Sequence, residues 1–156
     1  MTSMPAVGDK APDFSMPTDA GRTVSLADFA GASLVLYFYP KDDTSGCTRE
    51  AIDFTALVGD FRKAKTAVLG VSPDSVEKHA KFRDKHALQV ELASDPEQNA
   101  LNAYGVWVEK SMYGRKYMGV ERSTFLIDAT GTIRGIWRKV KVAGHAETVL
   151  EAARAL

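Results

Sequence analysis

The sequence predicts a three-layer α/β domain, and the order of its apolar runs carries this prediction. Uncharged apolar runs of strand length alternate with longer stretches in which apolar residues recur at helical spacing. Near the end of the chain, two strand-like runs are separated by a short turn that contains glycine. A last amphipathic stretch follows them. Elements in this order form one sheet with helices packed on its faces.

The start of the chain predicts an extended arm that ends in a hairpin. Residues 6–18 are rich in proline and aspartate, and the turn signal Asp19-Ala20-Gly21 separates them from the strand-like run 23–26. Ser25 is expected to cap a short helical turn over 26–29, because its side-chain oxygen can accept from a free amide there. We therefore expect an N-terminal hairpin extension ahead of the sheet.

The central strand is predicted over 34–39, where six apolar or aromatic residues follow one another. A run without charge is typical of a strand that is buried on both faces at the centre of a parallel sheet. Pro40 ends this strand, because proline has no amide hydrogen to donate to a neighbouring strand. A polar turn over 42–46 follows, and apolar residues at three- and four-residue steps from Cys47 onward predict a helix.

The rest of the chain repeats this alternation. The expected elements are a buried strand over 66–72, a charged helix over 75–88, a short strand over 90–94, a helix over 95–104, a strand over 120–128, a returning strand over 132–140 and a helix over 145–155. Residues 107–118 are irregular and are expected to form a loop at the rim of a site. This order is that of thioredoxin-like folds, and we expect residues 1–156 to form a single domain.

The composition excludes some classes of function. The 156 residues include 20 Lys and Arg and 20 Asp and Glu, so bulk charge predicts no nucleic-acid partner and no anionic membrane surface. No apolar run reaches the length of a membrane span, and residues 1–8 lack the pattern of a secretory signal. A single cysteine allows no internal disulfide, which together with these features favours a reducing, cytoplasmic setting.

The histidines predict no metal site. His79 and His86 are seven residues apart on one expected helix, so they share a face but lie two turns from each other, too far for one metal ion. We expect both to be solvated surface residues. His145 is expected to be a helix cap or a surface residue, and no role is assigned to it. No cofactor is predicted.

The only cysteine lies where chemistry is favoured. Cys47 falls in the first turn of its predicted helix, directly after the carboxyl end of the central strand, where ligands usually bind in open α/β sheets. The free amides and the dipole of a helix N-terminus stabilise a thiolate relative to a thiol. The alternative is that Cys47 is a small buried apolar residue, which is the usual environment of a lone cysteine.

The residues around the cysteine decide between these alternatives. Pro40, Thr44 and Cys47 form the pattern Pro-x-x-x-Thr-x-x-Cys, and the segment 37–48 resembles that of the peroxiredoxins, in particular the subgroup called bacterioferritin comigratory protein or peroxiredoxin Q. The similarity continues along the chain at 8–14, 70–74, 92–96 and 122–128. It implies a thioredoxin-like fold and a thiol-dependent peroxidase that reduces hydrogen peroxide and organic hydroperoxides. Members of this subgroup are often monomers, so we expect a monomer.

Peroxide reduction sets two requirements around the sulfur. The thiolate must be populated, and donors must face the oxygen that gains negative charge. Backbone amides near Gly46 and Cys47 can meet both needs. Thr44 lies three residues before the cysteine, so a turn is expected to bring its hydroxyl near the sulfur, where it can donate to and accept from a peroxide. Pro40 is expected to form a rigid apolar wall that shields the sulfur from water.

The resemblance also implies an arginine from a distant strand. Arg122 fits this position, and its planar, permanently charged guanidinium can stabilise the thiolate and orient peroxide oxygens. The alternative is that Arg122 is a strand-edge charge in solvent. Arg49, one turn into the helix, is a weaker candidate. Glu50 also lies in the first turn, where an acidic side chain is favourable for the helix dipole, so we interpret it as structural.

The chain departs from the subgroup at one position. Many members have a second cysteine five residues after the first, which resolves the oxidised sulfur as a disulfide, and here that position is Ile52. A sulfenic acid on Cys47 must then be rescued by an external thiol. The hypothesis is a one-cysteine mechanism with thioredoxin, glutaredoxin with glutathione, or a small thiol as the reductant.

Two other classes of function stay open at this level. One is a non-enzymatic peroxide sensor, in which Cys47 oxidises slowly and marks the protein for a partner. The other is an inert thioredoxin-like binding module, in which Cys47 is buried and resists alkylation. A thiol-disulfide oxidoreductase is disfavoured, because the Cys-x-x-Cys motif is absent from the sequence.

Overall fold

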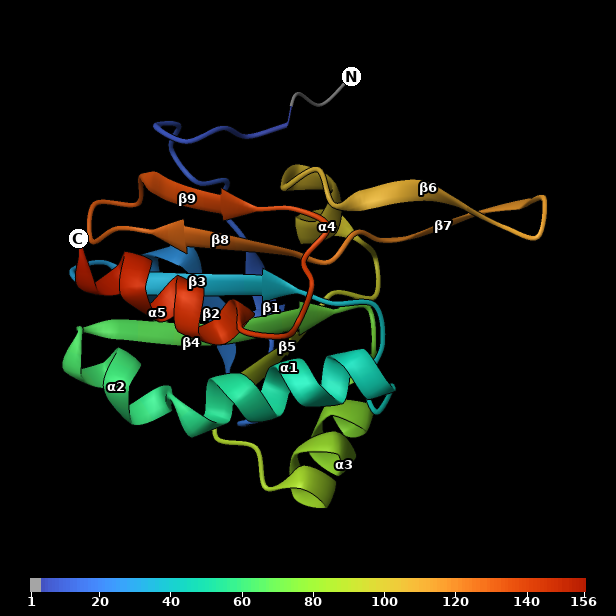
Figure 1. The fold of residues 1–156 in the computed structure, drawn as a ribbon, viewed down its shortest axis with the longest axis horizontal. Helices are drawn as coiled ribbons and strands as arrows, with labels where there is room; N and C mark the ends of the chain where they lie inside the picture. Colours follow the sequence, from blue (N-terminus) through green and yellow to red (C-terminus); the bar gives the residue numbers. More distant parts are fainter. Residues whose placement is uncertain (1–3) are drawn as a thin grey trace.

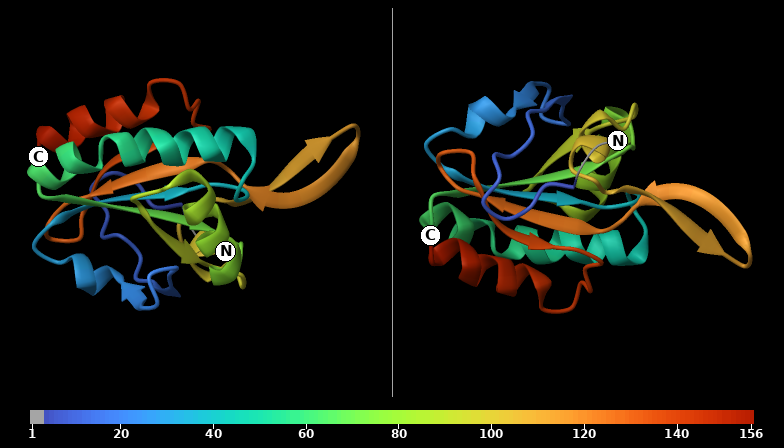
Figure 2. Two further views of the ribbon diagram at one scale, coloured as in Figure 1. Left: turned by 90° about the horizontal axis from the view of Figure 1, so that it is seen from below. Right: turned by 90° about the horizontal axis from the view of Figure 1, so that it is seen from above.

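A computed structural model describes residues 4–156, which form a sheet with helices on both faces (Figures 1 and 2). The strands are β1 (Ser15–Pro17), β2 (Thr23–Ser25), β3 (Ser33–Phe38), β4 (Thr66–Ser72), β5 (Glu91–Ser94), β6 (Trp107–Met112), β7 (Arg115–Val120), β8 (Ser123–Ile127) and β9 (Ile133–Trp137). The helices are α1 (Ser45–Ala56), α2 (Val58–Lys63), α3 (Val76–His86), α4 (Asn99–Ala103) and α5 (His145–Arg154), with the 3-10 helix η1 (Leu26–Phe29). The expectation of no secretory signal over 1–8 falls partly outside the described residues.

The main sheet has the strand order β5-β4-β3-β8-β9, so β3 is the central strand, as the sequence predicts. β3 is parallel to β4, and β4 is parallel to β5. On the other side, β8 runs antiparallel to both β3 and β9. The sheet is therefore mixed rather than all-parallel, and the predicted hairpin between the last two strands is confirmed.

Each face of the sheet is covered by its own group of elements. The helices α1, α2 and α5 pack on one face, and the N-terminal arm with α4 packs on the other (Figure 2). The short hairpin of β1 and β2, followed by η1, is the predicted N-terminal extension. The Asp28 carboxylate accepts from the Ser25 amide at 2.7 Å, which closes the turn that Ser25 opens. This arrangement confirms the predicted three-layer fold class.

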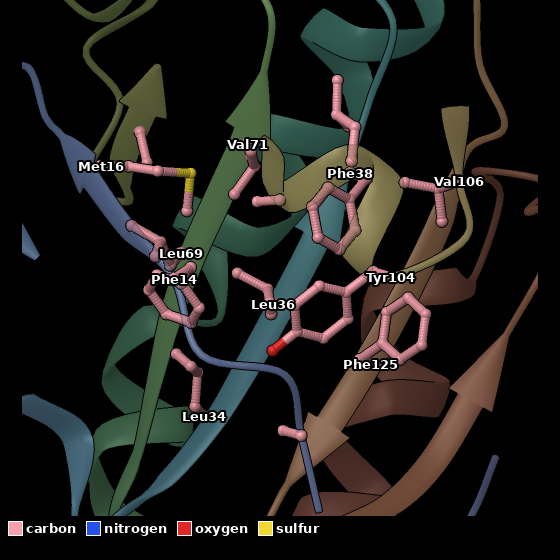
Figure 3. Packing of buried hydrophobic residues seen from close by; sticks show 14 of the residues in the cluster. Phe14, Met16, Leu34, Leu36, Phe38, Leu69, Val71, Tyr104, Val106 and Phe125 are labelled. Carbon is pink, nitrogen blue, oxygen red and sulfur yellow. The ribbon is translucent and has the colours of Figure 1, made fainter. Parts of the chain in front are cut away.

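Alternate side chains of β3 point to opposite faces of the sheet. Leu34, Leu36 and Phe38 pack against residues of β8, α4 and the N-terminal arm (Figure 3). Val35 and Tyr37 join the second cluster, which also contains Cys47. Because both faces are covered, all five side chains are at most 1% exposed. The charge-free run in the sequence reflects this double burial.

Tyr37 sets how closely α1 approaches the sheet. Gly70 lies opposite it on β4, and a Cβ at this glycine would lie 2.7 Å from the tyrosine hydroxyl. The tyrosine ring also stacks on Phe54 of α1, with ring centroids 4.7 Å apart. The ring cannot move away from the strand without moving the helix, so glycine is required at position 70.

Residues 107–118 do not form the irregular loop that the sequence predicts. β6 and β7 pair antiparallel over their whole length, and the hairpin extends away from the main sheet (Figure 1). Tyr113 and Gly114 have φ angles of 51° and 77°, the left-handed pair that a two-residue hairpin turn requires. Most side chains of both strands are exposed or half-buried, so alternation of apolar residues could not reveal them.

The helix expected over 95–104 begins later than predicted. α4 starts at Asn99, because Gln98 has a left-handed φ of 59° that no helix continues. Asp95 still satisfies free amides of the helix: its carboxylate accepts from the Asn99 amide at 3.1 Å and from the Leu101 amide at 2.9 Å. The Asp95 carboxylate therefore binds the start of α4 from the preceding turn, while Gln98 occupies the N-cap position.

Two of the histidines are not the surface residues that the sequence predicts. His79 is fully buried, and both of its ring nitrogens have partners. His145 is only 7% exposed, and its Nε2 lies 2.8 Å from the Thr124 hydroxyl. Burial, together with the positive charge of Arg122, lowers the pKa of His145 to about 4, so the ring is neutral. Helical spacing alone could not show which face of α3 packs inward.

Two further observations concern residues 4–156 as a whole. They contain no group of three or more His, Cys, Asp or Glu side chains placed to hold a metal ion. None of their helices is long and apolar enough to cross a membrane.

Candidate active site

Cys47 lies in the first turn of α1, at the end of the loop that follows β3. The helix begins at Ser45 with Thr44 as its N-cap, so the position predicted for the cysteine is confirmed. The side chain is a free thiol that is 2% exposed, and its neighbours on this face include Tyr37, Ala51 and Phe54. The sulfur thus sits between the amides of a helix N-terminus and an apolar floor.

Arg122 reaches the sulfur from the segment just before β8. Its Nη2 donates to Cys47 Sγ at 3.2 Å, across 75 positions of sequence. The sheet makes this approach possible, because Ser123 at the start of β8 pairs with Phe38 at the end of β3. The arginine therefore enters beside the end of the central strand, where α1 begins. Its side chain is 17% exposed, so it is not a strand-edge charge in solvent.

Glu50 completes a buried line of polar groups, which sequence reasoning missed. Its Oε1 accepts from Arg122 Nη1 at 2.7 Å, and its side chain is 1% exposed. Among the described residues, no hydrogen-bond donor faces its Oε2. The sequence offered one signal for this role, because Cys47 and Glu50 are three residues apart and therefore share a helix face. The Glu50 carboxylate therefore forms an ion pair with Arg122, in addition to any interaction with the helix dipole.

The charged side chains of Arg122 and Glu50 each change the pKa of the other. Burial alone would lower the pKa of Arg122, but the charges of Glu50 and Cys47 and their hydrogen bonds raise it, so the guanidinium stays charged. Burial raises the pKa of Glu50 to about 7, against the opposing effect of Arg122. The sulfur therefore lies beside a guanidinium that stays charged and in the first turn of a helix.

Gly46 leaves room for the arginine. A Cβ at this position would lie 3.2 Å from Arg122 Nη2, closer than an ordinary van der Waals contact. Because the same Nη2 makes the hydrogen bond to the sulfur, a larger residue would push the guanidinium out of place. Gly46, the second residue of α1, therefore leaves the guanidinium free to reach the sulfur.

The structure places the other predicted residues as follows. The Thr44 hydroxyl donates to the Lys41 carbonyl oxygen at 2.8 Å, and no hydrogen bond joins it to the sulfur within residues 4–156. Pro40 is half-buried at the bend that follows β3. Arg49 points away, with a side chain 66% exposed and 3.9 Å from Asp53.

The position expected to hold a second cysteine faces solvent. Ile52 lies on α1, one and a half turns after Cys47, and it is 43% exposed. An apolar side chain at this surface has no chemistry to offer an oxidised sulfur. Cys47 is the only cysteine of the sequence, so the chain itself holds no thiol that could form a disulfide with it.

Solved structures show the class to which this fold and site belong. Xanthomonas campestris peroxiredoxin Q superposes with a TM-score of 0.88 at 44% identity, over 99% of this chain and 96% of that chain. A Xylella fastidiosa PrxQ variant superposes with a TM-score of 0.92 at 39% identity, over 99% and 98% of the two chains. A thioredoxin-like fold of the peroxiredoxin Q type defines the class as that of the thiol-dependent peroxidases.

Sequence comparisons give the family. The AhpC/TSA family model matches residues 7–136. Peroxiredoxin Bcp of Bacillus subtilis is 49% identical over 145 residues, which cover 93% of this chain and 92% of that protein. Peroxiredoxin Bcp of Xanthomonas campestris is 47% identical over 143 residues, which cover 92% and 89%. The chain belongs to the AhpC/TSA family of peroxiredoxins, within the Bcp or peroxiredoxin Q group.

This membership decides between the functions that the sequence left open. The chain is an oxidoreductase of the peroxidase type, and neither a non-enzymatic sensor nor an inert binding module is favoured. Structures of the Xanthomonas campestris protein include Cys-to-Ser variants at two different positions, whereas this chain has a single cysteine. One of its structures concerns the alkyl peroxide reduction activity of that protein.

The pKa of Glu50 predicts a pH dependence of stability. Since the folded-state pKa of about 7 lies above the unfolded value, the folded state binds more protons between these values. Stability is therefore expected to fall as the pH rises through this window, by roughly 1–3 kcal/mol. Glu50→Gln keeps an oxygen that accepts from Arg122 but does not titrate, so this loss should be absent from the variant.

Urea unfolding at pH 5, 6, 7 and 8 measures this effect as the difference in unfolding free energy between Glu50→Gln and the wild type. The difference is expected to shift in favour of the variant as the pH rises. Glu151→Gln is the matched control, because Glu151 is a helical glutamate with a side chain 72% exposed. A difference that is the same at pH 5 and pH 8 would contradict the role of Glu50.

Proposed function

We propose that this chain reduces hydrogen peroxide and small organic hydroperoxides by a one-cysteine mechanism with Cys47 as the attacking residue. The observation that carries the proposal is the 3.2 Å contact between Arg122 Nη2 and Cys47 Sγ at the start of a helix. It gives the sulfur a positive neighbour on one side and free amides on the other. The alkyl peroxide reduction of a relative supports the substrate class.

The first half-reaction transfers one oxygen atom to the sulfur. The thiolate attacks the nearer oxygen of the peroxide, an S–O bond forms and the O–O bond breaks. The other oxygen leaves with the bonding electron pair and takes up a proton, which yields water or an alcohol. Sulfur is oxidised to sulfenic acid, and the peroxide is reduced. Negative charge therefore moves from sulfur to the leaving oxygen during the step.

Arg122 is proposed to stabilise the negative charge first on the sulfur and then on the leaving oxygen. Its Nη2 donates to the sulfur in the resting state, and the guanidinium presents further N–H groups from the same plane to a peroxide oxygen. Glu50 holds the other edge of the guanidinium at 2.7 Å and so fixes its plane. The amides at the start of α1 add donors on the far side of the sulfur.

Thr44 and Pro40 are proposed to receive the peroxide. Because the Thr44 hydroxyl already donates to the Lys41 carbonyl, its oxygen is presented as an acceptor for the hydrogen of a hydroperoxide. The sequence led us to expect this hydroxyl near the sulfur; no hydrogen bond joins the two within residues 4–156, and the peroxide is proposed to bridge them. Pro40 contributes a rigid apolar surface with no N–H group that would compete for the substrate oxygen.

The second half-reaction is proposed to use an external thiol. A thiolate attacks the sulfenic sulfur, a mixed disulfide forms and water leaves; a second thiol then releases Cys47 as thiolate and takes up the disulfide. The chain holds no second cysteine, and Ile52 stands where one was expected. Thioredoxin, glutaredoxin with glutathione, or a small thiol is the proposed reductant.

The external thiol gives a direct test. Without added thiol, one equivalent of peroxide per chain should be consumed, and mass spectrometry should find one added oxygen on Cys47. With thioredoxin and its reductase, or with glutathione and glutaredoxin, consumption should continue, and the faster system identifies the reductant. Cys47→Ser should be inactive in both. Repeated turnover of the wild type without any added thiol would rule out the one-cysteine mechanism.

The role of Arg122 gives a second test. Arg122→Gln should lower the rate constant for Cys47 oxidation by roughly 100-fold, because it removes a charged donor from the transition state. The rate constant of Arg122→Lys should lie between those of the wild type and Arg122→Gln, since an ammonium keeps the charge but not the planar pair of donors. Arg49→Gln, an exposed arginine of the same helix, is the control and should be unaffected. Thr44→Val, compared with Thr44→Ser, is measured in the same stopped-flow assay.

The domain organisation, the oligomeric state and the cellular location are also part of the proposal. Residues 1–156 are proposed to form one domain that acts as a monomer in the cytoplasm. The two buried clusters lie on opposite faces of one sheet, which supports a single folding unit. Recycling a lone cysteine requires a reducing thiol pool, which supports the cytoplasm. Sedimentation velocity of the reduced and oxidised protein should give a single species of about 17 kDa; a dimer in either state would contradict the monomer.

A further inference from the structure

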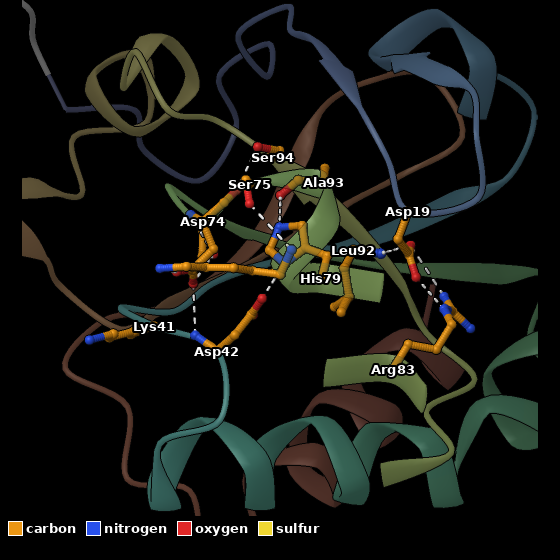
Figure 4. Close-up of polar contacts among 12 residues, drawn as sticks. Asp19, Lys41, Asp42, Asp74, Ser75, His79, Arg83, Leu92, Ala93 and Ser94 are labelled. Carbon is orange, nitrogen blue, oxygen red and sulfur yellow. Dashed lines mark hydrogen bonds and ion pairs between the residues drawn. The ribbon is translucent and has the colours of Figure 1, made fainter. Parts of the chain in front are cut away.

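A buried hydrogen-bonded cluster lies beneath the loop that leads to the catalytic helix (Figure 4). Asp42 stands at its centre. Its Oδ1 accepts from the Tyr39 hydroxyl at 2.6 Å, and its Oδ2 lies 2.6 Å from Nδ1 of His79 on α3. The backbone amide of Asp42 donates to Asp74 Oδ2 at 2.7 Å. One loop residue is therefore held from the end of β3, from α3 and from the turn after β4.

The pattern of acceptors determines the charge of His79. Its Nε2 lies 2.9 Å from the carbonyl oxygen of Ala93, which can only accept, so this nitrogen carries a hydrogen. A second hydrogen must lie between Nδ1 and Asp42, since neither bare atom can donate. Oδ1 of Asp42 already accepts from Tyr39, and a carboxylate can accept at both oxygens at once, so we place the hydrogen on the ring and treat the pair as a buried imidazolium and carboxylate.

The loop needs an anchor because its backbone is strained. Asp43 has a φ of 61°, in the left-handed region that costs free energy for a residue with a Cβ. Such residues persist where their surroundings over-determine them. The Asp43 carboxylate pairs with Lys85 at 2.7 Å and His86 at 2.9 Å, but these contacts are exposed and therefore weak. The buried anchor is Asp42, one residue earlier.

The strained loop connects directly to the site. The Lys41 carbonyl, next to Asp42, accepts from the Thr44 hydroxyl at 2.8 Å. The Thr44 carbonyl in turn accepts from the Thr48 amide in the first turn of α1 at 2.8 Å. A shift of Asp42 would therefore move the threonine and the start of the helix that carries Cys47.

We propose that His79, through its ion pair with Asp42, is a positioning residue for peroxide reduction at Cys47. It acts through the loop over 40–44 and touches neither the sulfur nor the peroxide. The proposal rests on the proposed function of Cys47, and it assigns to α3 a part in the reaction. Loss of the pair should let the loop relax and misplace Thr44.

The charge of His79 is tested by nitrogen-15 NMR of the full-length reduced protein labelled in histidine. At neutral pH, the spectrum should contain a ring with both nitrogens protonated. That signal should be missing from His79→Gln, which assigns it. A neutral His79 ring with one bare nitrogen would overturn the ion pair. This readout does not depend on peroxidase activity, so it stands even if the proposed function fails.

The positioning role is tested by the rate constant for oxidation of Cys47 by hydrogen peroxide. His79→Gln should lower it at least tenfold and up to about 100-fold, the scale of a misplaced reacting group. His86→Gln is the matched control, because His86 lies on the same helix and contacts the same loop at the surface. It should stay within about twofold of the wild type. A His79→Gln rate equal to that of the control would overturn the proposal.

Two further variants keep the test decisive if His79→Gln does not fold. Tyr39→Phe removes one hydrogen bond to Asp42 and keeps the ring, and it should still slow oxidation several-fold; a wild-type rate would overturn the proposal. The double variant Asp42→Asn with His79→Gln leaves no unpaired buried charge. It should be oxidised at least tenfold more slowly than the wild type, and a wild-type rate would overturn the proposal. A wild-type thiol that does not react with peroxide would instead refute the proposed function.

Discussion

The contact between the Arg122 guanidinium and the Cys47 sulfur is the interaction on which the rest of the site depends. The two residues are 75 positions apart, and they meet because β8 lies beside β3 in a register that pairs Ser123 with Phe38. That register delivers the arginine to the end of the central strand, where α1 begins. Gly46 leaves the space through which the guanidinium reaches the sulfur. The sheet thus brings a positive charge and a helix N-terminus to one atom.

Burial strengthens the interactions between these charges, but it also costs free energy because the charged groups lose their hydration. A guanidinium and a carboxylate lose hydration when they leave water, so a buried pair contributes less to stability than its short contact suggests. Glu50 shows this cost: burial raises its pKa to about 7, although Arg122 lies 2.7 Å away. The pair is better explained by the proposed reaction, in which a low-dielectric surrounding would strengthen every interaction with the thiolate and with the charge that moves off it.

The same principle operates a short distance away, beneath the loop. His79 and Asp42 form a second buried pair, while Lys85 and His86 form exposed pairs with the next loop residue, Asp43. The buried pair resists displacement and the exposed pairs do not, because water competes for the exposed ones. The loop that precedes Cys47 is therefore held most firmly from inside. With a single cysteine, the chain needs no movement that brings a second sulfur to the first, although an external thiol must still gain access.

The sequence by itself determined most of the elements, and it singled out Cys47 as the residue proposed to react. The central strand, the helix that begins before Cys47 and the closing hairpin all carry local signals of period, charge or turn residues, and the motif around Cys47 carried the family. Only the tertiary structure decided the hairpin of β6 and β7, whose exposed strands show no burial pattern, and the partners of Glu50 and His79. Those partners lie 72 and 37 positions away. Local sequence cannot encode such pairs, because the folded sheet determines which polar side chains share a buried space.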